Sequence, residues 1–274
     1  MKKLIITLLF LISVPNLFSF SGGTGTESDP YLISNADDWL TFADSVNYEY
    51  LGARYWSRYK YFKLTANIII PDVRIFRFYG YFDGDGYKLT VSIIGSGLFS
   101  VIDRIGIVER LRVDGTVSSS LDGVGSIAGV NHGIIRNCIN YAELSCYAGY
   151  IGGIAGENHN TINDCINYGN VSTPTDGAGG ISGDERGTIN RCINVGNVTA
   201  NQIVAGIAAS ITGRSSVSIS NSINMGNITG NGSVGGILGI VSLDYVTTLT
   251  NCINAGYIKG NQYVGGIYVY KSTN

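Results

Sequence analysis

The sequence predicts an all-β protein: a right-handed parallel β-helix, or β-solenoid, with a short N-terminal capping helix. Three observations predict this fold. A short phrase recurs every 27 or 30 residues, a glycine-rich segment recurs with it, and no repeat shows sustained helical periodicity. One repeat is too small to bury its own apolar side, so the repeats must stack and pair their strands in parallel.

The recurring phrase is Cys-Ile-Asn, or Ser-Ile-Asn in one copy, between residues 138 and 254. Its asparagine never varies, and stacked amides can hydrogen-bond from one coil to the next. Its first position also accepts Ser222 and, one period earlier, Leu111, which indicates a small buried position rather than a disulfide. The predicted structural ladder consists of Cys138, Cys165, Cys192, Cys252, Asn140, Asn167, Asn194, Asn224 and Asn254.

Glycine-rich segments give each repeat its first strand. They begin at residues 125, 152, 179, 205 and 235. In the repeat at 151–177 we expect strands at 152–156, at 161–165 and from 170 onward, separated by polar and Asn-Gly turns. Alternation should place the apolar residues of these strands, among them Ile162, inside the solenoid.

The chain divides into three expected segments. Residues 1–21 have the positive start, the apolar run and the small residues of a signal peptide. Residues 22–60 should form an N-terminal cap with one helix, because 34–37 resemble a capping box and an amphipathic stretch follows to about Asn47. Residues 61–274 should form the β-helix. Its repeats are expected at about 97–123, 124–150, 151–177, 178–203, 204–233 and 234–263, with a partial last coil at 264–274.

The composition excludes several classes of binding partner. A formal net charge of −2, with 14% charged residues, predicts neither nucleic-acid nor anionic-membrane binding. No hydrophobic segment beyond residues 1–21 is long enough to span a bilayer. No metal-ligand spacing is present, and the Asp-Gly-Asp-Gly sequence at 83–86 is better explained as a turn than as a calcium loop. We therefore expect no cofactor. Because residues 1–21 predict export, we expect a host or matrix protein or a glycan as partner.

Four segments, taken in order, resemble a known family. They are GGTGTESDPYLISNADDWLTFADSVN at 22–47, YFKLTANI at 61–68, YFDGDGYKLT at 81–90, and the repeats of the form GGIAG…TINDCINYGNV. The chain resembles the GLUG-motif proteins over nearly everything after the predicted signal peptide. The resemblance implies a secreted or surface-displayed bacterial protein with a β-solenoid, often adhesin-like. Similar repeats accompany some secreted peptidases as non-catalytic segments.

Two surfaces are candidates for function. The two histidines fall at one repeat position, and acidic and basic residues flank it, so stacking should gather them on one edge. This edge is either a ligand patch or a solvated turn; its residues are His132, His159, Glu157, Asp184 and Arg186. The second candidate is the isoleucine that follows each Cys or Ser. These residues form an exposed interface stripe if the strand alternates, or are buried if it bends; they are Ile139, Ile166, Ile193, Ile223 and Ile253.

The sequence predicts a non-enzymatic, exported, adhesin-like scaffold that binds through its solenoid faces. No Ser-His-Asp signal, no HExxH motif and no phosphate loop is present. One alternative is a β-helix polysaccharide lyase or glycosidase, which would need two positioned carboxylates or a basic residue beside the sugar. Another is a structural spacer or a truncated fragment of a larger surface protein.

Overall fold

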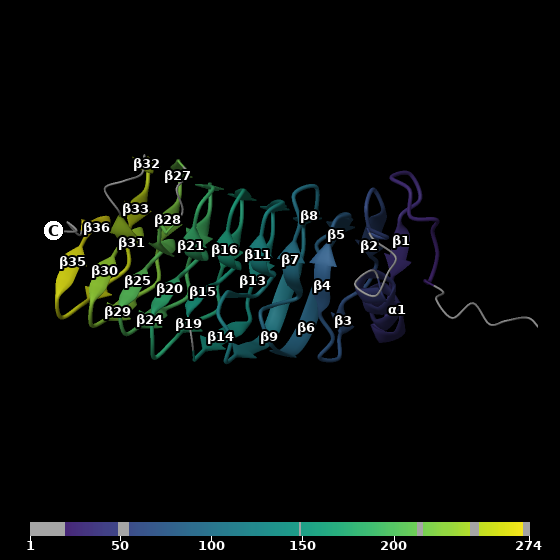
Figure 1. The fold of residues 1–274 in the computed structure, drawn as a ribbon, viewed down its shortest axis with the longest axis horizontal. Helices are drawn as coiled ribbons and strands as arrows, with labels where there is room; N and C mark the ends of the chain where they lie inside the picture. Colours follow the sequence, from purple (N-terminus) through teal and green to yellow (C-terminus); the bar gives the residue numbers. More distant parts are fainter. Residues whose placement is uncertain (1–19, 49–54, 148, 213–215, 242–246, 271–274) are drawn as a thin grey trace, which may run out of the picture.

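The computed structural model describes residues 20–48, 55–147, 149–212, 216–241 and 247–270. The predicted signal peptide at 1–21 lies almost wholly outside these residues. Within them the chain forms one α-helix and 36 strands, which wind into an elongated solenoid with the helix at its N-terminal end (Figure 1). The predicted all-β parallel solenoid with a short N-terminal helix is confirmed.

The strands form four parallel sheets that run along the solenoid. Sheet I contains β1 (Tyr31–Ile33), β2 (Tyr61–Leu64), β5 (Tyr81–Asp83), β8 (Ile107–Glu109), β12 (Ile134–Arg136), β17 (Thr161–Asn163), β22 (Thr188–Asn190), β27 (Val217–Ser220) and β32 (Thr247–Thr250). Sheet II contains β3 (Ile68–Ile69), β6 (Lys88–Ile94), β9 (Arg112–Ser119), β13 (Ile139–Asn140), β14 (Glu143–Cys146), β18 (Ile166–Asn167), β19 (Val171–Ser172), β23 (Ile193–Asn194), β24 (Val198–Ala200), β28 (Ile223–Asn224), β29 (Ile228–Gly230), β33 (Ile253–Asn254) and β34 (Ile258–Lys259).

The other two sheets hold the glycine-rich segments. Sheet III contains β10 (Val124–Gly125), β15 (Tyr150–Gly152), β20 (Gly177–Gly179), β25 (Ile203–Ala205), β30 (Ser233–Gly235) and β35 (Tyr263–Gly265). Sheet IV contains β4 (Ile75–Phe78), β7 (Phe99–Ile102), β11 (Ala128–Asn131), β16 (Ala155–Asn158), β21 (Ser182–Glu185), β26 (Ala208–Ser210), β31 (Leu238–Val241) and β36 (Tyr268–Tyr270). Each full coil therefore runs through sheets III, IV, I and II in turn.

Equivalent repeat positions lie side by side. Ile162 of β17 pairs with Ile189 of β22, and Ile189 pairs with Ile219 of β27. These side chains are fully buried, as are Ile154 and Cys165. The apolar positions of the repeat thus form continuous inward columns, as the alternation predicts.

The predicted strand at 161–165 is broken by a bend, and this corrects the expected three strands per repeat. β17 ends at Asn163, and Asp164 has a φ of 54°. Such left-handed backbone is uncommon outside glycine and ends the strand. The bend recurs in six successive coils with φ between 50° and 54°, at Arg110, Asn137, Asp164, Arg191, Asn221 and Asn251.

The predicted glycine-rich strand at 152–156 is also split, between β15 and β16. A Cβ built on Gly153 would lie 2.2 Å from the carbonyl oxygen of Gly180 and 2.4 Å from the side-chain Cγ of Asn167. Gly180 has the same relation to Gly206 and Asn194 in the next coil. The second glycine of the motif is therefore required by close packing against the Asn-containing coil corner.

An aromatic core closes the N-terminal end of the solenoid. Helix α1 (Ala36–Asn47) begins after Asn35, whose side chain accepts a hydrogen bond from the backbone N–H of Asp38. The Asp38 carboxylate in turn accepts the backbone N–H of Ser34 at 2.8 Å. The helix packs against β1 and β4. The largest aromatic side chains of this core are fully buried; they are Trp39, Phe42, Phe62, Phe78, Phe82 and Phe99.

Candidate functional site

The predicted edge residues do come together. His132, His159 and Arg186 each follow the last residue of a sheet IV strand, at β11, β16 and β21. The imidazole rings of His132 and His159 lie 4.5 Å apart between centroids. Glu157 Oε2 lies 3.0 Å from His159 Nε2 and 3.5 Å from Arg186 Nη2.

The contacts of this edge cluster are made among its own residues and with Thr212. Asp184 is fully buried and accepts hydrogen bonds from Arg186 Nε at 2.7 Å and from the backbone N–H of Thr212 at 3.0 Å. The hydrogen bond from His159 and the charge of Arg186 lower the pKa of Glu157. Burial and the nearby His159 lower the pKa of His132. Glu157 is thus stabilised in its charged form by neighbouring groups, and a ligand-binding role for this edge stays a prediction.

A buried ladder that the sequence analysis missed lies beside this edge. Asn131 Nδ2 donates to Asn158 Oδ1 at 2.7 Å, and Asn158 Nδ2 donates to Glu185 Oε1 at 2.7 Å. Glu185 is fully buried, and burial raises its pKa to about 8. The signal was present in the sequence, since these three residues are spaced at the same interval as the Cys-Ile-Asn phrase.

The predicted Asn column forms a continuous hydrogen-bonded ladder. Each Nδ2 donates to the Oδ1 of the next coil at 2.7 or 2.8 Å, from Asn140 through to Asn254. The same Nδ2 of Asn167 also donates to the carbonyl of Gly169 at 2.9 Å, which holds the following turn. Both amide functions are therefore used inside the protein, which is a structural role.

The cysteines of the ladder are free, and Cys138, Cys165 and Cys192 are fully buried. Cys165 Sγ lies 3.2 Å from the carbonyl oxygen two residues earlier, and the hydroxyl of Ser222 donates to the equivalent carbonyl at 2.9 Å. The column therefore accepts either residue because both can satisfy the carbonyl beside the bend. Burial, followed by the neighbouring thiols, raises the pKa of Cys165.

The isoleucine column faces outward. Ile166 and its equivalents Ile139, Ile193 and Ile223 are half-buried between a buried Cys or Ser and a buried Asn, and Ile253 is 55% exposed. The stacked backbones are in register from β13 to β33. Strand alternation thus continues through this corner, which decides between the two interpretations left open by the sequence.

A second outward column lies two residues further along. Tyr141 and Tyr168 are 42% and 44% exposed, and their rings stack with centroids 5.0 Å apart and an interplanar angle of 4°. Val195 and Met225 continue the column and are also exposed. We call the two columns together the apolar stripe; it consists of Ile139, Ile166, Ile193, Ile223, Ile253, Tyr141, Tyr168, Val195 and Met225.

A pocket of about 580 Å³ on the outer face of sheet I was also missed by the sequence analysis. Tyr61, Tyr81 and Ile107 stand next to each other in register on β2, β5 and β8. Two residues further along each strand, the register gives Lys63, Asp83 and Glu109, and Glu109 is followed by Arg136 of β12. The segment at 27–30 forms one wall of the pocket.

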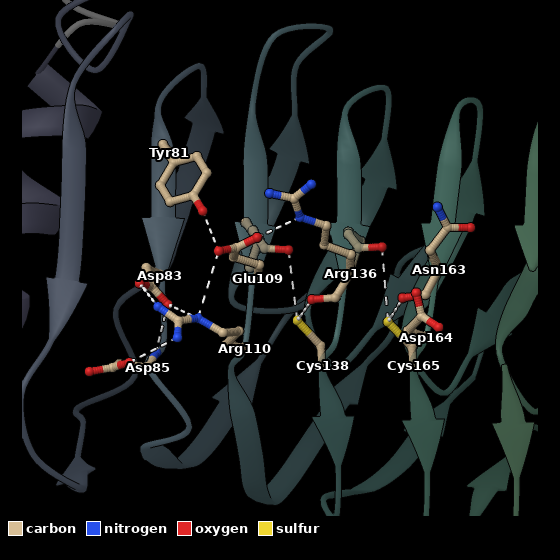
Figure 2. Close-up of polar contacts among 12 residues, drawn as sticks. Tyr81, Asp83, Asp85, Glu109, Arg110, Arg136, Cys138, Asn163, Asp164 and Cys165 are labelled. Carbon is tan, nitrogen blue, oxygen red and sulfur yellow. Dashed lines mark hydrogen bonds and ion pairs between the residues drawn. The ribbon is translucent and has the colours of Figure 1, made fainter. Parts of the chain in front are cut away.

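The polar groups of this pocket are joined by hydrogen bonds and ion pairs (Figure 2). The Tyr81 hydroxyl donates to Glu109, and Arg136 Nε donates to the other Glu109 oxygen. Arg110 pairs with both Asp83 and Asp85, the two acids of the predicted turn at 83–86. Burial and the hydrogen bond to Glu109 raise the pKa of Tyr81 to about 12, so its hydroxyl stays protonated as a donor.

The sequence signal for this pocket was the register of the degenerate first coils. Glu109 precedes Arg136 by one repeat length, just as Leu111 precedes Cys138. Asp83 and Glu109 are therefore neighbours although they are 26 residues apart. The sequence analysis treated Asp83 only as part of a local turn and did not extend the repeat back to it. Within the described ranges, no group of three or more His, Cys, Asp and Glu side chains is placed to hold a metal ion together.

Comparison with known proteins shows the fold but no family. No family model matches the chain. A curated protein of Evansella cellulosilytica, named "Putative Gly-rich membrane protein", is 32% identical over 140 residues. That match covers 43% of this chain and 15% of the relative's own length. In the part of the chain that the structure describes, no helix has the length and apolar character needed to cross a membrane.

Two solved structures share the solenoid. One is a Bacteroides ovatus protein named "putative immunoglobulin A1 protease", with a TM-score of 0.73 and 24% identity over 92% of this chain and 87% of that chain. The other is named "IgA1 Protease", with a TM-score of 0.61 and 17% identity over 88% of this chain and 20% of that chain. At these identities the likeness shows the fold alone.

These names correct one expectation. The sequence analysis predicted that the chain is not an enzyme, because its motifs include no known catalytic constellation. Both solved structures with this solenoid are named as proteases, which points the other way. The prediction failed because a solenoid of this kind is a scaffold, and a fold does not determine the activity of the protein that contains it.

Proposed function

We propose that the chain is the partner-binding solenoid of an exported or surface-displayed protein of the GLUG-motif type, and that it docks a protein through the apolar stripe. The observation that carries the proposal is the stripe itself. Five stacked coils present an outward isoleucine, and four of them carry a further apolar side chain two residues along, at Tyr141, Tyr168, Val195 and Met225. Contiguous exposed apolar surface of this kind usually marks an interaction site.

The local structure suits a rigid docking surface. The buried Asn ladder runs between the two columns of the stripe, so the backbone carrying Ile166 and Tyr168 is fixed on both sides. A preorganised surface loses little conformational entropy on binding. Aromatic side chains such as the stacked Tyr141 and Tyr168 are enriched at binding hot spots.

Three observations support the proposed location of the protein outside the cell or at its surface. The first residues of the chain have the pattern of a signal peptide. The curated relative is named as a membrane protein, and both solved structures are named as IgA1 proteases, which act on an antibody. A protein partner outside the cell is therefore the partner class that we propose.

The test is binding of the full chain to immobilised IgA1, fibronectin and collagen, measured by biolayer interferometry. We expect binding to at least one of them, weakened about tenfold or more by the double variant Ile166→Lys/Ile193→Lys. The matched control is Thr199→Lys/Thr229→Lys. It adds the same charge to exposed positions of sheet II in a column that already carries Lys259. Equal weakening by the two double variants, or no binding to any of the three proteins, would refute the proposal.

A proteolytic role is the second candidate, favoured by the names of the two solved structures. Incubation of the full chain with IgA1, followed by electrophoresis of the products, tests it directly. Discrete cleavage products that are absent from a buffer control would establish it. Intact IgA1 after prolonged incubation would restrict the chain to binding.

A further inference from the structure

The pocket on sheet I offers two different surfaces to a ligand. Tyr61, Tyr81 and Ile107 form an apolar row across three neighbouring strands, and the two tyrosine rings lie 5.2 Å apart between centroids. Beside this row runs a polar row, in which Lys63 and Arg136 lie at the two ends. The apolar stripe lies on sheet II, so this pocket is a separate surface.

The basic side chains of the pocket are all paired with carboxylates, and Glu27 in the pocket wall adds one further acid. Lys63 pairs with Asp85 at 3.0 Å, Arg110 pairs with Asp83 and Asp85, and Arg136 pairs with Glu109. Three basic groups thus meet three acidic groups. An anionic ligand would have to compete with the carboxylates for the basic groups, and a metal cation would have to compete with Arg110 and Arg136 for the carboxylates.

We propose that this pocket binds a neutral carbohydrate chain. Sugars have an apolar C–H face and hydroxyl groups around the ring edge, which can both donate and accept hydrogen bonds. The tyrosine row matches the apolar face through dispersion and area burial. Glu27 and Asp83 in the pocket lining supply acceptors next to it, and Lys63 and Arg136 supply donors.

The polar row also sets the selectivity. Asp83 and Glu109 are less than 10% exposed, and arginine contacts fix their carboxylates. Lys63 and Arg136 beside them are more exposed, and a ligand without hydroxyl groups would remove water from these donors without replacing its hydrogen bonds, which is costly. The pocket therefore favours a polyhydroxylated ligand over an apolar one of the same size.

The rest of sheet I extends the pocket along the solenoid. Beyond Ile134 and Arg136, the two outward rows continue only with hydroxyl and amide side chains. They are Thr161, Thr188, Ser218 and Thr248 in one row, and Asn163, Asn190, Ser220 and Thr250 in the other. A linear oligosaccharide that starts on the tyrosines can thus run parallel to the solenoid axis over uncharged hydrogen-bonding groups.

The test titrates the full chain with four neutral hexasaccharides, maltohexaose, cellohexaose, xylohexaose and mannohexaose, by calorimetry. Polygalacturonate serves as an anionic probe. We expect at least one neutral hexasaccharide to bind, with affinity reduced about tenfold or more by Tyr61→Ala and largely kept by Tyr61→Phe. The stripe variant Ile166→Lys/Ile193→Lys should bind the sugar as the unmodified chain does.

Three results would overturn the proposal: no binding of any neutral hexasaccharide, tighter binding of polygalacturonate, or an unchanged affinity in Tyr61→Ala. Circular dichroism of each variant establishes that it is folded. Because the stripe variant is included, loss of sugar binding at the pocket and loss of protein binding at the stripe are measured independently.

Discussion

At the scale of single residues, neighbouring side chains in each repeat lie in opposite environments, one in the core and the next at the surface. Cys165 and Asn167 are fully buried, while Ile166 between them reaches the surface. The left-handed bend at Asp164 precedes this triplet and exposes a carbonyl that the Cys165 thiol approaches at 3.2 Å. Which residue type fits this corner therefore depends on hydrogen bonding to the carbonyl of the bend as much as on hydrophobicity.

The thiols should be protected by burial. Cys138, Cys146, Cys165 and Cys192 are buried, and Cys252 is only half-buried. In native protein, a thiol reagent should modify Cys252 first and leave the others largely unreacted, because burial keeps the reagent away from them. Denaturant should then expose all five. Rapid native reaction of every thiol, followed by peptide mapping, would contradict the burial.

Glu185 should make the stability depend on pH. Its pKa is raised from 4.5 to about 8, so the folded state favours the protonated form. The contribution of Glu185 to stability should therefore be fully present below about pH 4.5, fall as pH rises from about 4.5 to about 8, and level off above that. Urea unfolding of the chain and of Glu185→Gln at a series of pH values measures this. The difference between the two should grow through this window, and parallel curves would argue against a raised pKa.

At the scale of elements, the coils are held together by ladders and by close glycine packing. The Asn ladder joins five coils, and the second ladder joins three through Asn131, Asn158 and Glu185. The interior residues of both ladders are buried, so the loss of one of them leaves the partners on both sides without these hydrogen bonds.

Asn194→Ala should be much more damaging than Asn254→Ala. Asn194 is fully buried in the middle of the ladder, where it accepts from Asn167 and donates to Asn224. Its removal should cost at least about 2 kcal/mol of unfolding free energy. Asn254 is half-buried at the ladder end, and its removal should cost under about 1 kcal/mol. Urea titrations compare them, and equal costs would show that the ladder does not act as a unit.

The second glycine of the glycine-rich motif gives a matched pair of substitutions. A Cβ at Gly180 would lie 2.1 Å from the carbonyl oxygen of Gly206 and 2.3 Å from Asn194 Cγ. At Gly266, the equivalent position in the last described coil, a Cβ would meet nothing within 4 Å. Gly180→Ala should thus destabilise by about 1–3 kcal/mol through overpacking, and Gly266→Ala should be close to neutral. Thermal unfolding of the two variants decides the point.

At the scale of the whole molecule, the repeat period predicted most of the fold. The 27- and 30-residue spacing fixed the parallel register, and alternation identified the inward columns such as Ile162. The bends were not predictable from one repeat. Residues as different as Asp164 and Arg191 take the left-handed conformation there, because the neighbouring coils impose it.

The functional surfaces were only partly predictable. The isoleucine stripe followed from the strong repeats, but the pocket depends on the weak first coils and on the segment at 27–30, which is distant in sequence. Asp83 and Glu109 become neighbours only through the register of β5 and β8. Long-range pairing of this kind leaves no local pattern, so it must be seen in the structure.

The central claim is that the isoleucine after each Cys or Ser faces out while the apolar residue four positions before it, such as Ile162 before Ile166, faces in. The direct measurement is thermal unfolding, by circular dichroism, of two double variants: Ile166→Lys/Ile193→Lys and Ile162→Lys/Ile189→Lys. The first places charges on the half-exposed stripe and should unfold cooperatively within a few degrees of the unmodified chain. The second buries two unpaired charges in the core and should abolish the folded state. Unfolding of the stripe variant to the same extent as the core variant would contradict the account.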